Sequence, residues 1–246
     1  MEMCFVCGCP RSGTTALAQM INEHPQALLG VERFKYIAMG SRGAEFKPEL
    51  FEQDRFIDIR DTDTNLKGAN LPIAQKAASI WPPQVIGEKI PRLYMRQKYL
   101  RDTFPKSKLV AIVRDPLAVA LSWQARADNP KDHWPAKNGA AQGFEEWAKS
   151  VNFIAAAAPL WKDDLIVVNY ETFFGYNDMA EFKDKIKVLF SKLSLDDSDE
   201  ILDHVAKALF RAPSAKKSKP IPEEYAALVE TARQHDKLEK VLSSAI

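Results

Sequence analysis

Residues 8–15 read GCPRSGTT and could hold a phosphate-like group. The two glycines have the spacing of the phosphate-binding motif G-x-x-x-x-G-K-S/T, but Thr14 stands where that motif has lysine. Because an apolar segment precedes the loop and a helical pattern follows it, successive backbone N–H groups and a helix N-terminus can converge on one anion. Arg11 supplies the positive charge that position 14 lacks. The predicted anion-binding residues are Arg11, Ser12, Gly13, Thr14 and Thr15.

A second candidate is Arg114, which follows the apolar run KLVAIV at 108–113. A nucleoside triphosphatase needs a carboxylate at the end of a neighbouring strand to organise Mg²⁺, and here Arg114 precedes Asp115 at that place. Together with the missing loop lysine, this cation indicates a donor with less charge at its reacting end than a triphosphate, activated by Arg and Lys without metal. A sulfonate on a nucleotide fits. The alternatives are a P-loop kinase or hydrolase that uses ATP and Mg²⁺, and a non-catalytic nucleotide-binding protein.

At these positions the sequence resembles the sulfotransferases that use 3′-phosphoadenosine 5′-phosphosulfate (PAPS). PRSGTT at 10–15 is similar to their 5′-phosphosulfate loop, and VRDPLAVALS at 113–122 to their 3′-phosphate motif of a strand-end Arg and a later Ser. VVNYETF at 167–173 is also similar, although Asn169 stands where a basic residue is common. The resemblance covers roughly the first 175 residues in the expected order. It implies PAPS as donor, adenosine 3′,5′-bisphosphate as product, and Arg114 and Ser122 as ligands of the 3′-phosphate.

A closer resemblance is to the branch that contains tyrosylprotein sulfotransferases and related bacterial enzymes. Residues 10–32 have that branch's layout of loop, helix, His-Pro and strand ending in a catalytic glutamate, which places Glu32 in that role. GEKIPRL at 87–93 resembles the segment of a catalytic lysine and places Lys89 there. The resemblance implies that Glu32 is the base, while Arg11 and Lys89 stabilise charge on the leaving phosphate. Phe34 stands where that branch has arginine, so a peptide acceptor is not implied.

Glu32 and Lys89 also have structural interpretations. Glu32 could be a surface or N-cap carboxylate before the run at 33–39, and Lys89 a solvated lysine before a turn. The basic stretch RAPSAKKSKPIP at 211–222 could fold over the nucleotide or simply be solvated. His133 and Trp134 lie in a polar segment that could meet an acceptor, with no definite role.

The strand-end arginine has similar alternatives. Arg114 could pair with Asp115 or Glu171, and Ser122 could bond its own helix backbone. Glu171 is better interpreted as a structural residue that holds the loop or Arg114.

Five short apolar runs must position these residues: 3–7, 27–31, 85–89, 108–113 and 164–169. They alternate with helical patterns, such as the one that spaces Leu17, Met20 and Ile21. This order predicts a three-layer α/β fold of the P-loop type, with a central parallel sheet flanked by helices and a helical C-terminal part. Ligands then gather at the carboxyl ends of the strands. Segments 41–70 and 128–143 break the pattern and are predicted to be surface loops or acceptor-facing lids.

The composition sets outer limits on these interpretations. A chain of 246 residues with 46% hydrophobic residues can form one enzyme-sized domain, expected over 1–246. A net charge of +1 favours neither nucleic acid nor an anionic membrane as partner. No apolar run approaches the ~20 residues of a membrane span, so we expect a soluble, cytoplasmic protein. Its expected partner is an acceptor with a hydroxyl group, such as a glycan, a small metabolite or a phenol; the oligomeric state is not predicted.

The cysteines follow the spacing C-x-x-C-x-C at positions 4, 7 and 9. This spacing could suggest a metal site, but no fourth cysteine is nearby and the histidines are scattered. We therefore expect Cys4, Cys7 and Cys9 to be small buried hydrophobic residues and predict no metal site.

Overall fold

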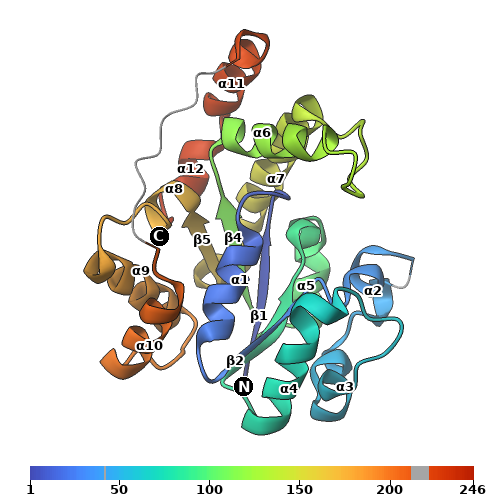
Figure 1. Cartoon of the computed structure of the whole chain (residues 1–246), viewed down its shortest axis with the longest axis vertical. Helices are drawn as coiled ribbons and strands as arrows, with labels where there is room; N and C mark the ends of the chain where they lie inside the picture. Colours follow the sequence, from blue (N-terminus) through green and yellow to red (C-terminus); the bar gives the residue numbers. More distant parts are fainter. Residues whose placement is uncertain (42, 212–221) are drawn as a thin grey trace.

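The computed structural model describes residues 1–41, 43–211 and 222–246 (Figure 1). Its centre is a parallel sheet in the order β2-β3-β1-β4-β5. The strands are β1 Glu2–Gly8, β2 Ala27–Val31, β3 Val85–Lys89, β4 Lys108–Val113 and β5 Leu165–Asn169. The five apolar runs of the sequence match these strands within one residue at each end. The predicted α/β fold with a central parallel sheet is confirmed.

Both faces of the sheet are covered because the strands are apolar on both sides. Alternate residues of β1 enter two separate clusters of buried side chains, with Cys4 and Val6 in one and Phe5 and Cys7 in the other. On the first face lie α1 Thr14–Glu23, α9 Met179–Lys192 and α10 Asp199–Leu209. On the second face lie α5 Gln97–Thr103, α6 Pro116–Ala127, α7 Ala140–Trp161, α11 Ala226–Arg233 and α12 Leu238–Leu242.

Segment 41–70 differs from the loop that its weak periodicity predicts. Between its turns are the short helical elements η1 Gly43–Glu45, η2 Pro48–Phe51, α3 Gln53–Ile57 and η3 Leu66–Asn70. Phe46, Phe51 and Phe56 are buried, and the rings of Phe46 and Phe51 lie 5.8 and 5.9 Å from that of Phe5. The surface-loop prediction was wrong here, since three- to five-residue helices are too short to show a 3.6-residue period.

Segment 128–143 is a loop only in part, since α7 begins at Ala140. Before that residue no regular helix or strand forms from 129 to 139. The remaining short elements are α2 Lys35–Met39, α4 Leu71–Ile80, η4 Pro91–Arg96, η5 Lys162–Asp164, α8 Tyr170–Phe173 and η6 Glu223–Tyr225. The basic stretch at 211–222 falls, apart from its two ends, on residues outside the described part of the chain.

Cys4, Cys7 and Cys9 are all buried, and burial raises the pKa of each thiol. They serve as the small hydrophobic residues that the sequence predicts. In the ranges that the structure describes, no helix is both long and apolar enough to cross a membrane.

Candidate active site

The loop between β1 and α1 has the backbone geometry of an anion cradle. Gly13 is the N-cap of α1 with φ of 99°, and Arg11 also has a positive φ of 78°. A Cβ on Gly13 would lie 2.7 Å from the Tyr170 ring, so both the backbone angle and the space require glycine. No side chain caps the helix, and no acceptor among residues 1–41, 43–211 and 222–246 pairs with the N–H groups of Thr14 and Thr15. These unpaired N–H groups fit an anion.

Ser12 closes this loop from the inside. Its side chain is fully buried, and both its N–H and its Oγ donate to the Cys9 carbonyl, at 3.0 and 2.6 Å. Ser12 therefore does not line the cavity, whereas Arg11, Gly13, Thr14 and Thr15 do.

The predicted 3′-phosphate residues lie beside the loop. Arg11 Nε donates to Ser122 Oγ (3.1 Å), so the serine hydroxyl meets the loop. The guanidinium of Arg114 donates to the Arg11 carbonyl (3.2 Å) and stacks 4.2 Å from the Tyr170 ring centre. Burial lowers the pKa of Arg11, and the nearby positive charges, Arg114 among them, lower it further. Such crowding of cations favours a bound anion.

Arg114 keeps an unused donor. Its Nε is buried and has no hydrogen-bond partner in the described residues, and it forms no ion pair there with Asp115 or Glu171. Instead Glu171 accepts a bond from the Asp115 N–H (3.0 Å) and so holds the turn after β4, one of the two structural roles considered for it. A group such as a nucleotide phosphate fits the buried Nε of Arg114.

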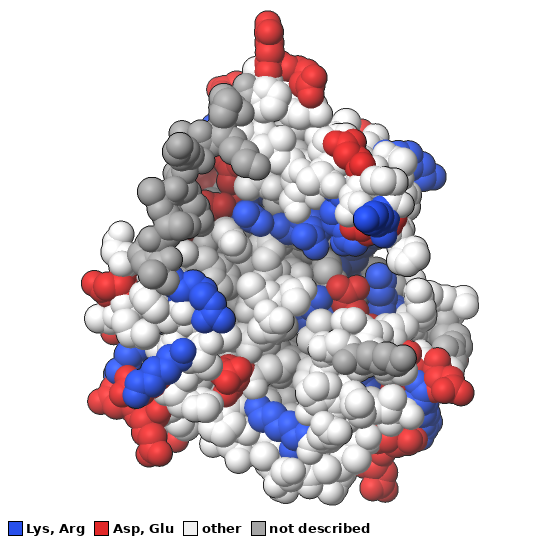
Figure 2. Space-filling view, viewed as in Figure 1, with Lys and Arg blue, Asp and Glu red and all other residues white. Residues whose placement is uncertain are grey.

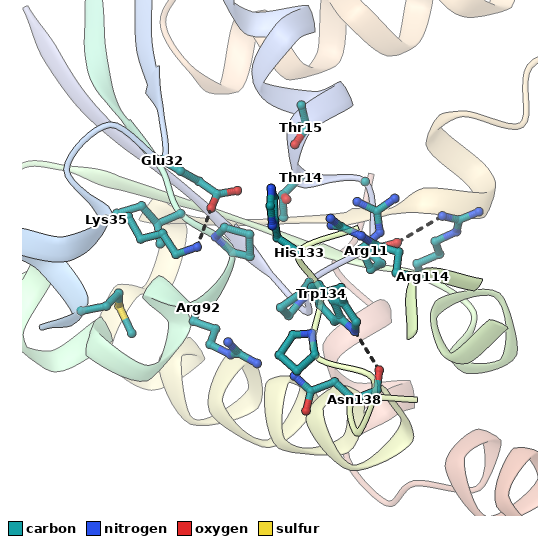
Figure 3. Close-up of a pocket in the computed structure, with 17 residues that line it drawn as sticks. Arg11, Thr14, Thr15, Glu32, Lys35, Arg92, Arg114, His133, Trp134 and Asn138 are labelled. Atoms are coloured by element: carbon teal, nitrogen blue, oxygen red, sulfur yellow. Dashed lines mark hydrogen bonds and ion pairs between the residues drawn. The ribbon is translucent and has the colours of Figure 1, made fainter. Parts of the chain in front are cut away.

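Glu32 lies on the other side of the loop from Arg11 and Arg114 (Figure 3), and Lys89 contacts it. The parallel register places Lys89 beside Val31, the residue that precedes Glu32. Lys89 Nζ is 2.9 Å from Glu32 Oε1 and 3.1 Å from Thr15 Oγ1, while Lys35 Nζ is 3.2 Å from Glu32 Oε2. Burial alone would raise the pKa of Glu32, but Lys89 and Lys35 outweigh it and hold this pKa below its usual value. The carboxylate is therefore ionised at neutral pH.

Glu32 sits in a left-handed turn with φ of 55°, which other residues hold in place. Its N–H donates to the Lys89 carbonyl (2.8 Å), and its carbonyl accepts from Thr64 Oγ1. The next N–H, that of Arg33, donates to Glu88 Oε1 (3.0 Å). Burial raises the pKa of Glu88 to about 8, so this carboxyl is protonated at neutral pH.

The Arg33 side chain anchors the same turn to segment 53–63. Its Nε donates to Asp63 Oδ2 (2.9 Å), and its side chain is 1% exposed against 0% for Asp63. It also donates to the carbonyls of Phe56 (2.6 Å) and Asp58 (2.7 Å). Sequence reasoning missed Arg33, Asp63 and Glu88. Only Glu88 had a signal in the sequence, because it is a charged residue inside the strand-like run VIGEK at 85–89.

A cavity of about 640 Å³ lies at the carboxyl ends of the strands. Glu32 and Arg114 line it together with the loop residues, whereas Lys89 and Ser122 lie behind its surface. Figure 2 shows Lys and Arg side chains gathered around this hollow below α6. The charged lining consists of Arg11, Glu32, Lys35, Arg92, Arg114 and Arg126. Loop residues 133–135 and 138 form a further wall, in which Trp134 packs against Trp123 with ring centres 4.8 Å apart. Because Trp123 Nε1 donates to the Pro10 carbonyl (2.9 Å), this wall is tied to the phosphate loop.

The sheet order, the glycine-rich turn and the cations around it define an α/β protein of the P-loop type. Residues 4–179, more than half of the chain, match the family model described as Sulfotransferase family. The chain belongs to the sulfotransferase family.

The chain is similar to other sulfotransferases and to a nodulation protein at low sequence identity. Nodulation protein NoeE of Sinorhizobium fredii (strain NGR234) is 26% identical over 128 residues, a match that spans 49% of this chain but only 30% of that protein. A sulfotransferase from Alicyclobacillus acidocaldarius is 12% identical with a TM-score of 0.58, over 100% of this chain and 97% of that one. Mouse sulfotransferase SULT7A1, solved in complex with PAP, is 18% identical with a TM-score of 0.50, over 84% and 64% of the two chains.

Proposed function

We propose that this protein transfers a sulfuryl group from PAPS to a hydroxyl group of a small molecule, glycan or phenol. The observation that carries the proposal is that Arg11, Ser122 and Arg114 meet on one side of the phosphate loop while Lys89 and Glu32 meet on the other. The PAP bound to mouse SULT7A1 supports the choice of donor. The proposal treats residues 1–246 as one domain, in keeping with the hydrogen bond from the Ile246 N–H to the Val167 carbonyl of β5 (3.0 Å).

PAPS supplies the activated sulfuryl group, and the chain's residues bind and orient it. The N-terminal N–H groups of α1 and the Thr14 and Thr15 hydroxyls hold the 5′-phosphosulfate. Arg114 and Ser122 hold the 3′-phosphate, which distinguishes this donor from ATP.

The oxygen of the acceptor hydroxyl forms a bond to sulfur, and the bond from sulfur to the 5′-phosphate oxygen breaks. Glu32 accepts the proton that this hydroxyl loses. Lys89 and Arg11 stabilise the charge that develops on that leaving oxygen. Lys89 is placed between Thr15 and Glu32, so it can turn from one to the other. When it leaves Glu32, the carboxylate loses a neighbouring cation and its pKa rises, which makes it a stronger base.

Two cations at the strand ends argue against the ATP- and Mg²⁺-dependent alternative. The residues that end β3 and follow β4 are Lys89 and Arg114, both cations where a magnesium carboxylate would be needed. Family membership also favours sulfuryl over phosphoryl transfer.

The test is release of adenosine 3′,5′-bisphosphate from PAPS, followed by chromatography, in the presence of mixed phenols, sugars and alcohols. Glu32→Gln should lower the acceptor-dependent rate about 10²- to 10⁴-fold, because the base is lost. Glu49→Gln changes an exposed carboxylate on η2 and should keep the wild-type rate. A wild-type rate in Glu32→Gln, or no acceptor-dependent release from the wild type, contradicts the proposal.

A further inference from the structure

Arg92 lines the cavity at the end away from the donor residues. Arg92 belongs to η4, which begins two residues after Lys89, the last residue of β3. In Figure 3 it lies below Lys35 and far from Arg114, with its guanidinium directed toward the side of Trp134 and Asn138. Arg92 and Glu32 line the same cavity.

Glu146 holds one edge of the Arg92 guanidinium. Nε donates to Glu146 Oε1, and the Tyr94 hydroxyl donates to the same oxygen (2.6 Å). Burial alone would raise the pKa of Glu146, but Arg92 and Tyr94 outweigh it and lower this pKa. Glu146 is therefore ionised at neutral pH and orients the arginine.

The other edge is free to bind a ligand. The two terminal nitrogens of Arg92 make no hydrogen bond to residues 1–41, 43–211 or 222–246, and the side chain is 44% exposed. Arg126 in the same cavity differs, because its Nε and one terminal nitrogen bond Asp132 at 2.7 and 2.5 Å and its guanidinium lies 4.8 Å from the Trp134 ring centre. Arg126 therefore stabilises the loop, whereas the terminal nitrogens of Arg92 are available to a ligand in the cavity.

We propose that Arg92 binds a carboxylate of the acceptor, so that the substrates are small hydroxy acids. An acceptor that fills the cavity removes water from the two terminal nitrogens, and a molecule without a hydrogen-bond acceptor at that point would leave them unpaired. A carboxylate pairs with both nitrogens because its two oxygens match the guanidinium fork. Met39, Trp134 and Pro135 line the cavity and contact the apolar part of the acceptor. This inference rests on the proposed function and adds its substrate class.

The test compares matched acceptors that differ in one carboxylate. The probes are 4-hydroxybenzoate against 4-hydroxybenzamide and glucuronate against glucose, each assayed by bisphosphate release from PAPS. The wild type should prefer the acid in at least one pair. Arg92→Ala should lower kcat/KM for that acid about 10- to 100-fold, mainly through KM, with little change for the neutral partner. Arg92→Lys keeps the positive charge but loses the two-nitrogen fork, so its kcat/KM for the acid should lie between those of the wild type and Arg92→Ala.

Two controls separate this inference from the donor assignment. Arg60→Ala removes an exposed arginine outside the cavity and should leave the preference unchanged. Calorimetric titration with adenosine 3′,5′-bisphosphate should give the wild-type affinity in Arg92→Ala, which also shows that the variant is folded. The carboxylate site is wrong, and the donor assignment stands, if the wild type uses acid and neutral acceptors equally or uses neither pair. The same holds if Arg92→Ala keeps the wild-type preference for the acid. A wild type that does not bind the bisphosphate overturns the donor assignment and this inference with it.

Discussion

Asp63→Asn tests the buried ion pair that anchors the turn carrying Glu32. Asp63 accepts from Arg33 Nε (2.9 Å), from both terminal nitrogens of Arg55 and from the Arg60 N–H (3.3 Å). Asparagine keeps the shape but removes the charge, and its amide group faces guanidinium donors. The Arg33 guanidinium, whose side chain is 1% exposed, then stays buried without a counter-charge.

Removing one partner of a buried pair costs about 3–5 kcal/mol of unfolding free energy. For a chain of this size that loss corresponds to a Tm lower by roughly 10 °C. Asp58→Asn is the matched control, because Asp58 pairs with Arg60 at the surface, where the two side chains are 53% and 56% exposed. An exposed pair contributes about 0–1 kcal/mol, so the control should unfold close to the wild type.

The assay is urea denaturation followed by circular dichroism at several pH values. Burial alone would raise the pKa of Asp63, but Arg55 and Arg33 outweigh it and hold the pKa below the usual 3.8. The stabilisation is therefore fully present above pH 3.8 and is lost as the pH falls through the lower folded-state pKa. The gap between wild type and Asp63→Asn should stay constant from pH 6 to 8 and close in acid. A gap no larger than that of Asp58→Asn would show that the buried pair of Arg33 and Asp63 contributes no more than a surface pair.

Three further variants test other parts of the site. Gly13→Ala should lose about 2–4 kcal/mol of unfolding free energy in urea, from its positive φ and the Tyr170 ring 2.7 Å from the new Cβ; an unchanged midpoint would show that the loop tolerates a side chain. Arg114→Ala should weaken adenosine 3′,5′-bisphosphate about 10- to 100-fold in calorimetry with little effect on ADP, and an equal loss for both would argue against a 3′-phosphate site. Burial raises the pKa of Glu88 to about 8, so its contribution to stability is full below 4.5 and is lost as the pH rises to about 8. Glu88→Gln should remove this decline of about 1.4 kcal/mol per pH unit, and equal slopes in both proteins would contradict it.

The sheet and the phosphate loop could be predicted because both are local in sequence. Each strand is a continuous apolar run, and the loop is one motif between a strand and a helix. Arg114 could be predicted from its place at a strand end, because parallel strands bring their carboxyl ends to one edge. Arg11 came from the loop motif, and Ser122 from the resemblance of residues 113–122 to the 3′-phosphate motif.

The support of Glu32 could not be predicted, because it depends on contacts distant in sequence. Asp63 lies in a polar segment, and only the packing of that segment buries it against Arg33. The orientation of Arg92 depends on Glu146, which is 54 residues away. Charge and hydropathy alone do not distinguish such residues from solvated ones.

The most direct test of the account is calorimetric titration of the purified protein in EDTA with adenosine 3′,5′-bisphosphate and, separately, with ADP. We expect the bisphosphate to bind without metal. ADP should bind far more weakly, because it has no 3′-phosphate for Arg114 and Ser122 to hold. Binding of neither nucleotide, or of ADP only after Mg²⁺ is restored, would contradict the account and favour a kinase-like site.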